Sequence, residues 1–193
     1  MKSILSPLRV ALAGGLRGRV LDCGSGEDLF GPCLRRAGNE VVSLDVDPEA
    51  LRRTPGRTVL AGCTDMPFDD DAFDAVWACA IIEHVTDETL PEMVRVTRPG
   101  GRIVAVTPNA HSPFDNVKRL LGLPTWWDNP GHVRLYSARE LRAYGPVHGE
   151  TRFLPLLRWF FWRVPAMAHV LILDCRVTPA VKAAAVRRRR RRR

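Results

Sequence analysis

Short apolar runs rich in β-branched residues alternate along this chain with segments whose apolar positions recur at helical spacing. This alternation predicts βαβ units, and therefore an α/β fold built on a parallel sheet. The expected strands cover residues 19–23, 40–44, 58–61, 72–78 and 102–107, and the expected helices cover residues 29–37, a short segment from residue 48, and residues 88–97.

The last third of the chain is less regular. Residues 111–136 are rich in Pro, Gly and Trp and are too long for a simple connection, which favours a lid or binding loop. Ser137 and Glu140 have the spacing of a capping box, and they predict a helix that runs to Tyr144. Residues 147–153 and 168–177 predict two final strands that pair antiparallel.

The formal net charge of +8 arises at one end of the chain. Residues 187–193 are seven consecutive arginines, and without them the 29 basic residues fall to 22 against 21 acidic ones. The body of the protein therefore shows no excess of positive charge, and no specific nucleic-acid partner is expected. Residues 179–193 predict a basic, disordered tail that lies outside the folded domain.

The five scattered cysteines indicate the redox compartment of the protein and bear on whether it binds a metal ion. They are odd in number and never spaced Cys-x-x-Cys, which argues against a zinc site or a disulfide framework. This usage fits a reducing cytosol, so we expect a cytoplasmic protein without a metal ion. At the N-terminus, Pro7 and Arg9 interrupt the apolar stretch that a secretion signal needs, so residues 1–13 predict a short helix.

The most informative motif follows the first strand. Asp22 and Gly24-Ser25-Gly26 form an acidic residue followed by a glycine turn, whose open backbone lets a ligand approach closely. A dinucleotide fingerprint needs a third glycine at the position of Leu29, which weakens an NAD site. Asp45 ends the second strand, where it either binds ribose hydroxyls or caps the next turn.

Further motifs follow in a fixed order along residues 18–145. They are Val41 to Asp47, Gly62 to Phe68, Phe73 to Trp77 with Glu83-His84-Val85, Arg98 to Arg102 with Pro108-Asn109, and Gly131 to Ser137. Together with Val20 to Gly26, this series resembles the class I S-adenosylmethionine-dependent methyltransferases, in particular the small-molecule group that includes the ubiquinone- and menaquinone-type enzymes.

The resemblance implies a Rossmann-like, doubly wound sheet of seven strands, mostly parallel with an antiparallel final strand. It implies a single methyltransferase domain over residues 1–178, with S-adenosylmethionine as cofactor. Its lid and acceptor region would comprise residues 111–136 and 154–166. The implied cofactor-binding residues are Asp22, Gly24, Ser25, Gly26, Asp45, Val46, Asp65, Met66 and Ala80, with Asp45 on the ribose, Asp65 on the adenine amine and Met66 against the adenine ring.

One residue departs from the family pattern. The family has Gly-x-Gly-x-Gly in the turn, and here Asp28 takes the place of the third glycine. Its side chain would either crowd the cofactor or contact the cofactor's ammonium group.

Histidines are the candidate catalytic residues. Methyl transfer to oxygen often needs a base, and imidazole is the side chain best suited to that role near neutral pH. His84 follows the fourth strand and His132 lies in the segment before the capped helix, and each is either catalytic or structural. His111 is a weaker candidate, and Glu83 either orients a neighbour or caps the helix that follows.

These features predict methyl transfer to a small, apolar acceptor, at oxygen in the first place or at carbon. The segment Leu156 to Trp162 and the pair Trp126-Trp127 either complete the core or form an acceptor pocket or a surface that touches a membrane. The alternative function is a non-catalytic protein that binds S-adenosylmethionine and uses its aromatic segment and arginine tail to contact a membrane or partner.

Overall fold

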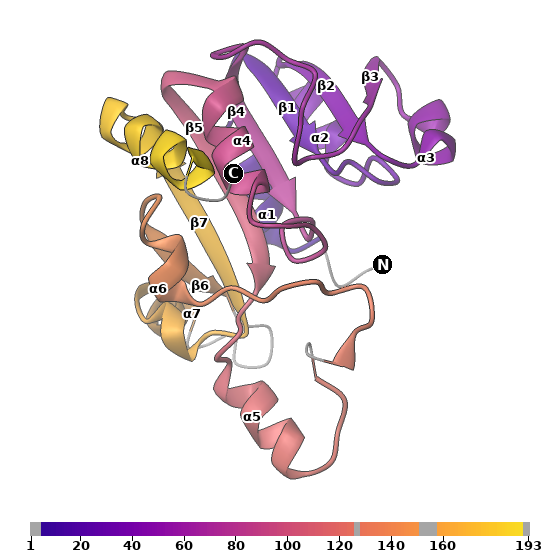
Figure 1. Ribbon diagram of the computed structural model, residues 1–193. Helices are drawn as coiled ribbons and strands as arrows, with labels where there is room; N and C mark the ends of the chain where they lie inside the picture. Colours follow the sequence, from indigo (N-terminus) through magenta and orange to yellow (C-terminus); the bar gives the residue numbers. More distant parts are fainter. Residues whose placement is uncertain (1–4, 126–127, 151–157, 191–193) are drawn as a thin grey trace.

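A computed structural model describes residues 5–125, 128–150 and 158–190. Seven strands form one sheet in the order β3-β2-β1-β4-β5-β7-β6 (Figure 1). β1 to β5 are parallel, and β7 lies antiparallel between β5 and β6. The strands are β1 (Arg19–Cys23), β2 (Glu40–Asp45), β3 (Arg57–Leu60), β4 (Phe73–Cys79), β5 (Thr97–Pro108), β6 (Val147–Glu150) and β7 (Val170–Arg176). The predicted Rossmann-like sheet with an antiparallel final strand is confirmed.

Helices cover both faces of this sheet. They are α1 (Pro7–Gly14), α2 (Gly31–Arg36), α3 (Pro48–Arg53), α4 (Thr89–Val96), α5 (Pro113–Leu120), α6 (Ala138–Leu141), α7 (Arg158–Arg163) and α8 (Pro179–Arg190), with a 3₁₀ turn at Pro165–Met167. The core on one face includes Leu16, Leu34 and Trp77 beneath α1 and α2. The core on the other face includes Met93 and Leu141, beneath α4 and α6. Because both faces are covered, Val20 and Leu21 on neighbouring positions of β1 are fully buried.

The N-terminal helix is attached to the far edge of the sheet by a buried ion pair. Nε of Arg9 lies 2.7 Å from Oε2 of Glu150 in β6, and the Ser6 hydroxyl donates to Oε1 of the same carboxylate at 2.5 Å. All three side chains are buried. The residues before β1 therefore belong to the folded domain, as the predicted short helix requires.

Strand β5 begins five residues earlier than expected. Pro99-Gly100-Gly101 lies inside β5, where the pairing with β4 shifts register between Phe73 and Ala75. A side chain at Gly101 would approach the Asp74 carbonyl oxygen to 2.7 Å, so only glycine fits there. The Gly100 amide donates to the Val177 carbonyl at 2.7 Å, which continues the sheet past the shift.

The expectation of a disordered tail from residue 179 is wrong for residues 179–190, which form α8. The run of alanines favours a helix, and the helix buries Ala185 and packs Val181 against the core. The Lys182 ammonium also pairs with Asp71 and donates to the Arg95 carbonyl at 3.1 Å. The run of arginines suggested a solvated segment, and the apolar face of this helix was therefore not predicted.

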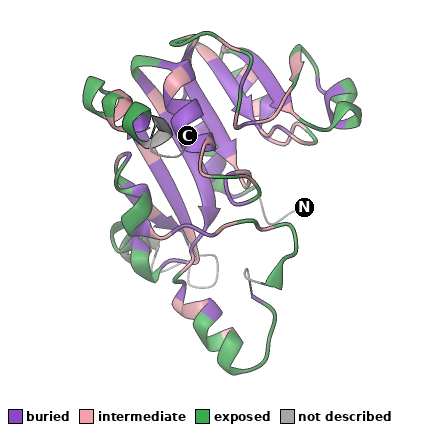
Figure 2. Ribbon diagram, in the orientation of Figure 1, coloured by how far each residue is buried: buried purple, intermediate pink, exposed green. Residues whose placement is uncertain are grey.

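The expected lid extends beyond the carboxyl ends of the parallel strands (Figure 1). It contains helix α5, which the sequence pattern did not indicate, and this helix is largely exposed (Figure 2). Trp126, Trp127 and residues 154–157 of the expected acceptor region lie outside the described residues. Within the described segments, no helix combines the length and the apolar character needed to cross a bilayer.

Candidate functional site

The glycine turn joins the carboxyl ends of β1 and β2. The amides of Gly24 and Ser25 both donate to the Leu44 carbonyl oxygen, at 2.8 and 3.1 Å. Gly24 has a left-handed backbone with φ of +71°, and a Cβ there would lie 2.5 Å from Cγ1 of Ile81. Strain and collision both exclude a side chain, so this glycine is required by the geometry that opens the turn toward a ligand.

Asp28 preserves the turn although it replaces a glycine. Its φ of +58° is the left-handed conformation that Asp and Asn tolerate better than other residues. Its carboxylate turns toward α2, where it pairs with Arg35 and fills the space that a side chain at Gly31 would need. Asp28 is not among the residues that line the adjoining cavity, so it leaves that cavity open.

A cavity of about 180 Å³ lies over the turn. It is lined by Asp22, Gly24, Ser25, Gly26, Glu27, Leu29, Phe30, Trp77, Cys79 and Ala80. Oδ2 of Asp22, Oγ of Ser25 and Nε1 of Trp77 are buried without a hydrogen-bond partner among the described residues. Such groups are costly unless a ligand satisfies them, by roughly 1–3 kcal/mol each. The cavity therefore fits a polar ligand that donates hydrogen bonds to Asp22 and accepts them from the Ser25 hydroxyl and the Trp77 indole N–H.

The pKa of the Asp22 carboxyl lies near neutral pH. Burial raises its pKa, and the nearby charges of Asp28 and Asp45 raise it further, while Arg35 opposes them. The result is a pKa of about 7. A ligand ammonium placed against this carboxylate would stabilise its charged form, because the cation replaces the water that burial removes.

Asp45 lies beside the same turn at the end of β2. Its Oδ2 accepts from the Gly26 amide at 2.7 Å, and its Oδ1 accepts from the Asp47 amide at 2.9 Å. Asp45 thus caps the turn that follows, and its half-buried carboxylate also faces the glycine turn where a ribose would lie. The neighbouring Val46 is largely exposed, and Ala80 lines the cavity with a left-handed φ of +57°.

The other expected adenine contacts are placed less favourably. Asp65 is exposed, whereas Met66 is buried in the core. The Met66 amide donates to Oε2 of Glu92 at 3.1 Å, and Arg95 donates to the Met66 carbonyl at 2.9 Å. Met66 therefore offers little surface to an adenine ring, and neither residue lines the cavity.

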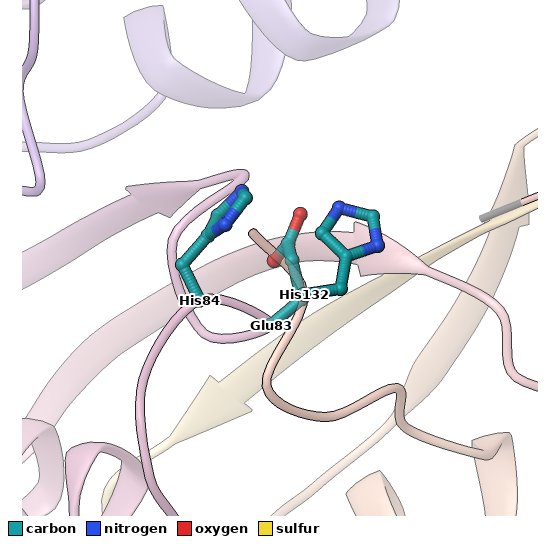
Figure 3. Close-up of side chains that lie close together, drawn as sticks. All are labelled: Glu83, His84 and His132. Carbon is teal, nitrogen blue, oxygen red and sulfur yellow. The ribbon is translucent and has the colours of Figure 1, made fainter. Parts of the chain in front are cut away.

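Three side chains gather just beyond the end of β4. Glu83, His84 and His132 each place a nitrogen or oxygen atom within 4.8 Å of those of the other two. The ring centroids of His84 and His132 are 4.9 Å apart, and the Glu83 carboxylate lies beside the two rings (Figure 3). The structure thus brings together the two predicted catalytic histidines, which are 48 positions apart in the sequence. His111 is exposed and belongs to the lid.

Glu83 is the buried member of this cluster. Its backbone carbonyl accepts from the amides of Val133 and Arg134 at 2.9 and 3.1 Å, which holds the His132 segment in place. Its carboxylate accepts from the Thr107 hydroxyl at 3.1 Å. Burial raises the pKa of Glu83, against the lowering effects of a backbone hydrogen bond, of His84 and of the Thr107 hydroxyl. Because α4 begins only at Thr89, Glu83 orients its neighbours and does not cap that helix.

Sequence reasoning missed several residues that line the cavity, above all Trp77. Trp77 pairs in register with Asp22 across β1 and β4, so two strand ends that were both recognised bring these side chains together. A larger cavity of about 270 Å³ lies elsewhere, between α4 and α6. Arg134 in its lining pairs with both Asp87 and Glu140, so it is the weaker candidate.

Comparisons with known proteins find methyltransferases among the proteins similar to this chain. Residues 21–105 match the family described as "Methyltransferase domain". The chain is 38% identical over 130 residues to a demethylmenaquinone methyltransferase of Clavibacter sepedonicus, covering 62% of this chain and 53% of that one. It is 31% identical over 99 residues to the chloroplastic tocopherol O-methyltransferase of Arabidopsis thaliana, covering 43% and 28%. The chain therefore spans about half or less of the length of these curated relatives.

A solved structure shares the fold across most of the chain. It is the 1,6-didemethyltoxoflavin-N1-methyltransferase of Burkholderia thailandensis, solved with 1,6-didemethyltoxoflavin and S-adenosylhomocysteine. The TM-score is 0.58 at 19% identity, and the match covers 89% of this chain and 77% of that one.

The raised pKa of Asp22 predicts that cofactor affinity depends on pH. The affinity for S-adenosylhomocysteine, whose ammonium needs an ionised partner, should rise between pH 6 and pH 8 as Asp22 loses its proton. Asp22→Asn should bind more weakly and abolish this rise, as measured by calorimetry. Asp47→Asn, which alters an exposed carboxylate, is the matched control and should keep the wild-type pH dependence.

The same carboxyl should affect stability in the opposite direction. Its folded pKa of about 7 exceeds its ordinary value of 3.8, so the unliganded protein loses stability as the pH rises from about 4 to 7. Asp22→Asn should raise the free energy of unfolding at pH 8 by roughly 2–4 kcal/mol and have little effect at pH 4. An equal effect at both pH values in denaturant titrations would contradict the assignment.

Proposed function

We propose that this chain, which carries a class I S-adenosylmethionine-dependent methyltransferase domain, transfers a methyl group to a small apolar molecule at an oxygen atom. S-adenosylmethionine supplies the methyl group on a sulfonium that is already strongly electrophilic. The contribution of the protein is therefore to bind, to orient and to accept a proton.

The three unpaired buried groups around the cavity carry this proposal. The Asp22 carboxylate binds the ammonium of the methionine part, with Ser25 and Trp77 supplying further polar contacts. Asp45 accepts from the ribose hydroxyls, since its carboxylate lies against the Gly26 amide at the edge of the turn. The reactive end of the cofactor then faces the end of β4, where Ala80 leads into Glu83 and His84.

The two histidines supply the base. His84 is held by its Nδ1, which lies 2.7 Å from the Gly131 carbonyl oxygen and donates to it. Its Nε2 therefore carries the lone pair, and this atom can take a proton from an acceptor hydroxyl. His132 lies beside the same Glu83 carboxylate and provides the second such group (Figure 3). This arrangement favours an oxygen acceptor, which needs deprotonation before it attacks.

The names of two relatives support an apolar acceptor with a ring. One is named for demethylmenaquinone and the other for tocopherol O-methylation, and both compounds are apolar, ring-bearing lipids. Methylation at carbon remains the second candidate because the first of these names does not specify oxygen.

The test is transfer of labelled methyl from S-adenosylmethionine to a panel of phenols and reduced quinones with apolar tails. Wild type should give O-methylated product. His84→Ala and His132→Ala should each lower kcat by about 10²–10⁴-fold and leave affinity for S-adenosylhomocysteine within a few-fold of wild type. His148→Ala, a histidine that stacks on Trp162, is the matched control.

Two outcomes contradict the proposal. Tight binding of S-adenosylhomocysteine without any methylated product would favour the non-catalytic binding protein. Full activity in both histidine variants would remove the base assignment.

We further propose that the lid touches a membrane surface from which an apolar acceptor is taken. Leu120 and Leu121 at the end of α5 are 87% and 65% exposed, and Lys118 and Arg119 precede them. Exposed leucines beside basic residues match the interface of an anionic bilayer, where apolar side chains enter and cations meet the headgroups. Trp159 in α7 is also exposed, although much of the aromatic segment lies outside the described residues.

Vesicle co-sedimentation with phosphatidylglycerol tests this contact. Leu120→Asp should weaken binding about tenfold or more, because it removes a large apolar group and adds a negative charge. Val186→Asp makes a comparable change on α8, where Val186 is also exposed, and should have a much smaller effect. Equal losses in the two variants would show that only net charge matters and would exclude α5 as the contact.

A further inference from the structure

Two imidazoles and one buried carboxylate converge at the end of β4, in a chain whose cysteine pattern gave no expectation of a metal site. The candidate donor atoms of Glu83, His84 and His132 all lie within 4.8 Å of one another. Glu83 is 1% exposed, so its carboxylate is nearly removed from water. A buried carboxylate that faces two nitrogen donors is a combination that transition metals favour.

Hydrogen bonds fix a ring nitrogen of each histidine. The Nδ1–H of His84 donates to the Gly131 carbonyl at 2.7 Å, which leaves a lone pair on Nε2. Asn129 uses its Oδ1 to accept from the Gly131 amide, so its amide nitrogen donates to Nε2 of His132 at 3.2 Å. Nε2 of His132 therefore carries a lone pair, which accepts this hydrogen bond and which a metal ion would take in place of the Asn129 amide. The carbonyl on Nδ1 of His84 is the usual support of a metal-bound histidine.

Main-chain hydrogen bonds join the segments that carry Glu83 and His132. The backbone carbonyl of Glu83 accepts from Val133 and Arg134, so Glu83 and His132 are held together by main-chain hydrogen bonds. Thr107 donates to Oε2 of Glu83, which orients the carboxylate. Bonds of about 2.0–2.2 Å require the donors to close by roughly 1–2 Å, which needs a rotation of the exposed His84 ring about its hydrogen bond to Gly131.

We propose that Glu83, His84 and His132 bind one divalent first-row transition metal ion, of which Zn²⁺ is the representative, with open coordination positions toward the methyl acceptor. Mg²⁺ is disfavoured because it prefers oxygen donors. Three protein ligands with an open position are typical of a catalytic site, whereas structural zinc sites are closed by four.

This inference rests on the proposed methyl transfer and changes the role of the histidines within it. The acceptor hydroxyl oxygen binds the ion, which lowers its pKa, and its proton leaves to solvent. The oxygen lone pair then forms the new O–CH₃ bond while the C–S bond breaks and sulfur keeps that electron pair. The products are the methylated acceptor, S-adenosylhomocysteine and one proton.

The test is metal binding to the chelator-stripped full chain. Calorimetry with Zn²⁺ and visible absorption with Co²⁺ should each show one ion per chain, with Co²⁺ bands that indicate mixed nitrogen and oxygen donors. Glu83→Gln and His132→Gln should each weaken binding at least tenfold. His84→Gln alters an exposed side chain and should weaken binding similarly without unfolding. His111→Gln, on an exposed histidine of the lid, should bind as wild type does.

Affinity for S-adenosylhomocysteine, measured on every variant, reports folding and the cofactor cavity separately. The inference is overturned if wild type binds neither ion below about 100 μM, or if His111→Gln loses as much affinity as His132→Gln. Methyl transfer that continues unchanged in excess chelator would also overturn it, and would leave the proposed function and its histidine base intact. Loss of transfer in chelator, restored by Zn²⁺ or Co²⁺ but not by Mg²⁺, is the result that we expect.

Discussion

One carbonyl oxygen fixes the geometry on which the candidate site depends. The Leu44 carbonyl at the end of β2 accepts both the Gly24 and the Ser25 amides, and so ties the turn after β1 to the neighbouring strand. The bend this requires is available only because Gly24 is left-handed and has no side chain to meet Ile81. Because this join holds the two strand ends in register, Asp22 and Ser25 line one cavity and Asp45 accepts from the Gly26 amide beside it.

The polar groups of the cavity are costly to the empty protein. Asp22 is buried with a raised pKa, and Oδ2 of Asp22, Oγ of Ser25 and Nε1 of Trp77 have no partner among the described residues. The rest of the fold offsets this cost by burying both faces of the sheet and by pairing Arg9 with Glu150 across its far edge. A cationic ligand would recover much of the cost, which links binding to stability at this position.

The sequence predicted the sheet and the glycine turn well, because strands buried on both faces read as short apolar runs and Gly-x-Gly has few alternative uses. It predicted His84 and His132 separately, but their meeting beside Glu83 depends on a lid segment whose path no local pattern reveals. It failed to predict α8, where burial of Ala185 outweighs the repulsion among the neighbouring arginines. Met66 was expected to contact adenine, but it is buried in the core, which the motif alone does not indicate.

The central claim is that the cavity over the glycine turn holds S-adenosylmethionine with its ammonium against Asp22. A crystal structure with bound S-adenosylhomocysteine tests this most directly. We expect the ammonium within hydrogen-bond distance of Oδ2 of Asp22, the ribose beside Asp45, and the sulfur directed toward Glu83 and His84. A ligand found in the larger cavity between α4 and α6, or in the turn with its ammonium away from Asp22, would contradict the account.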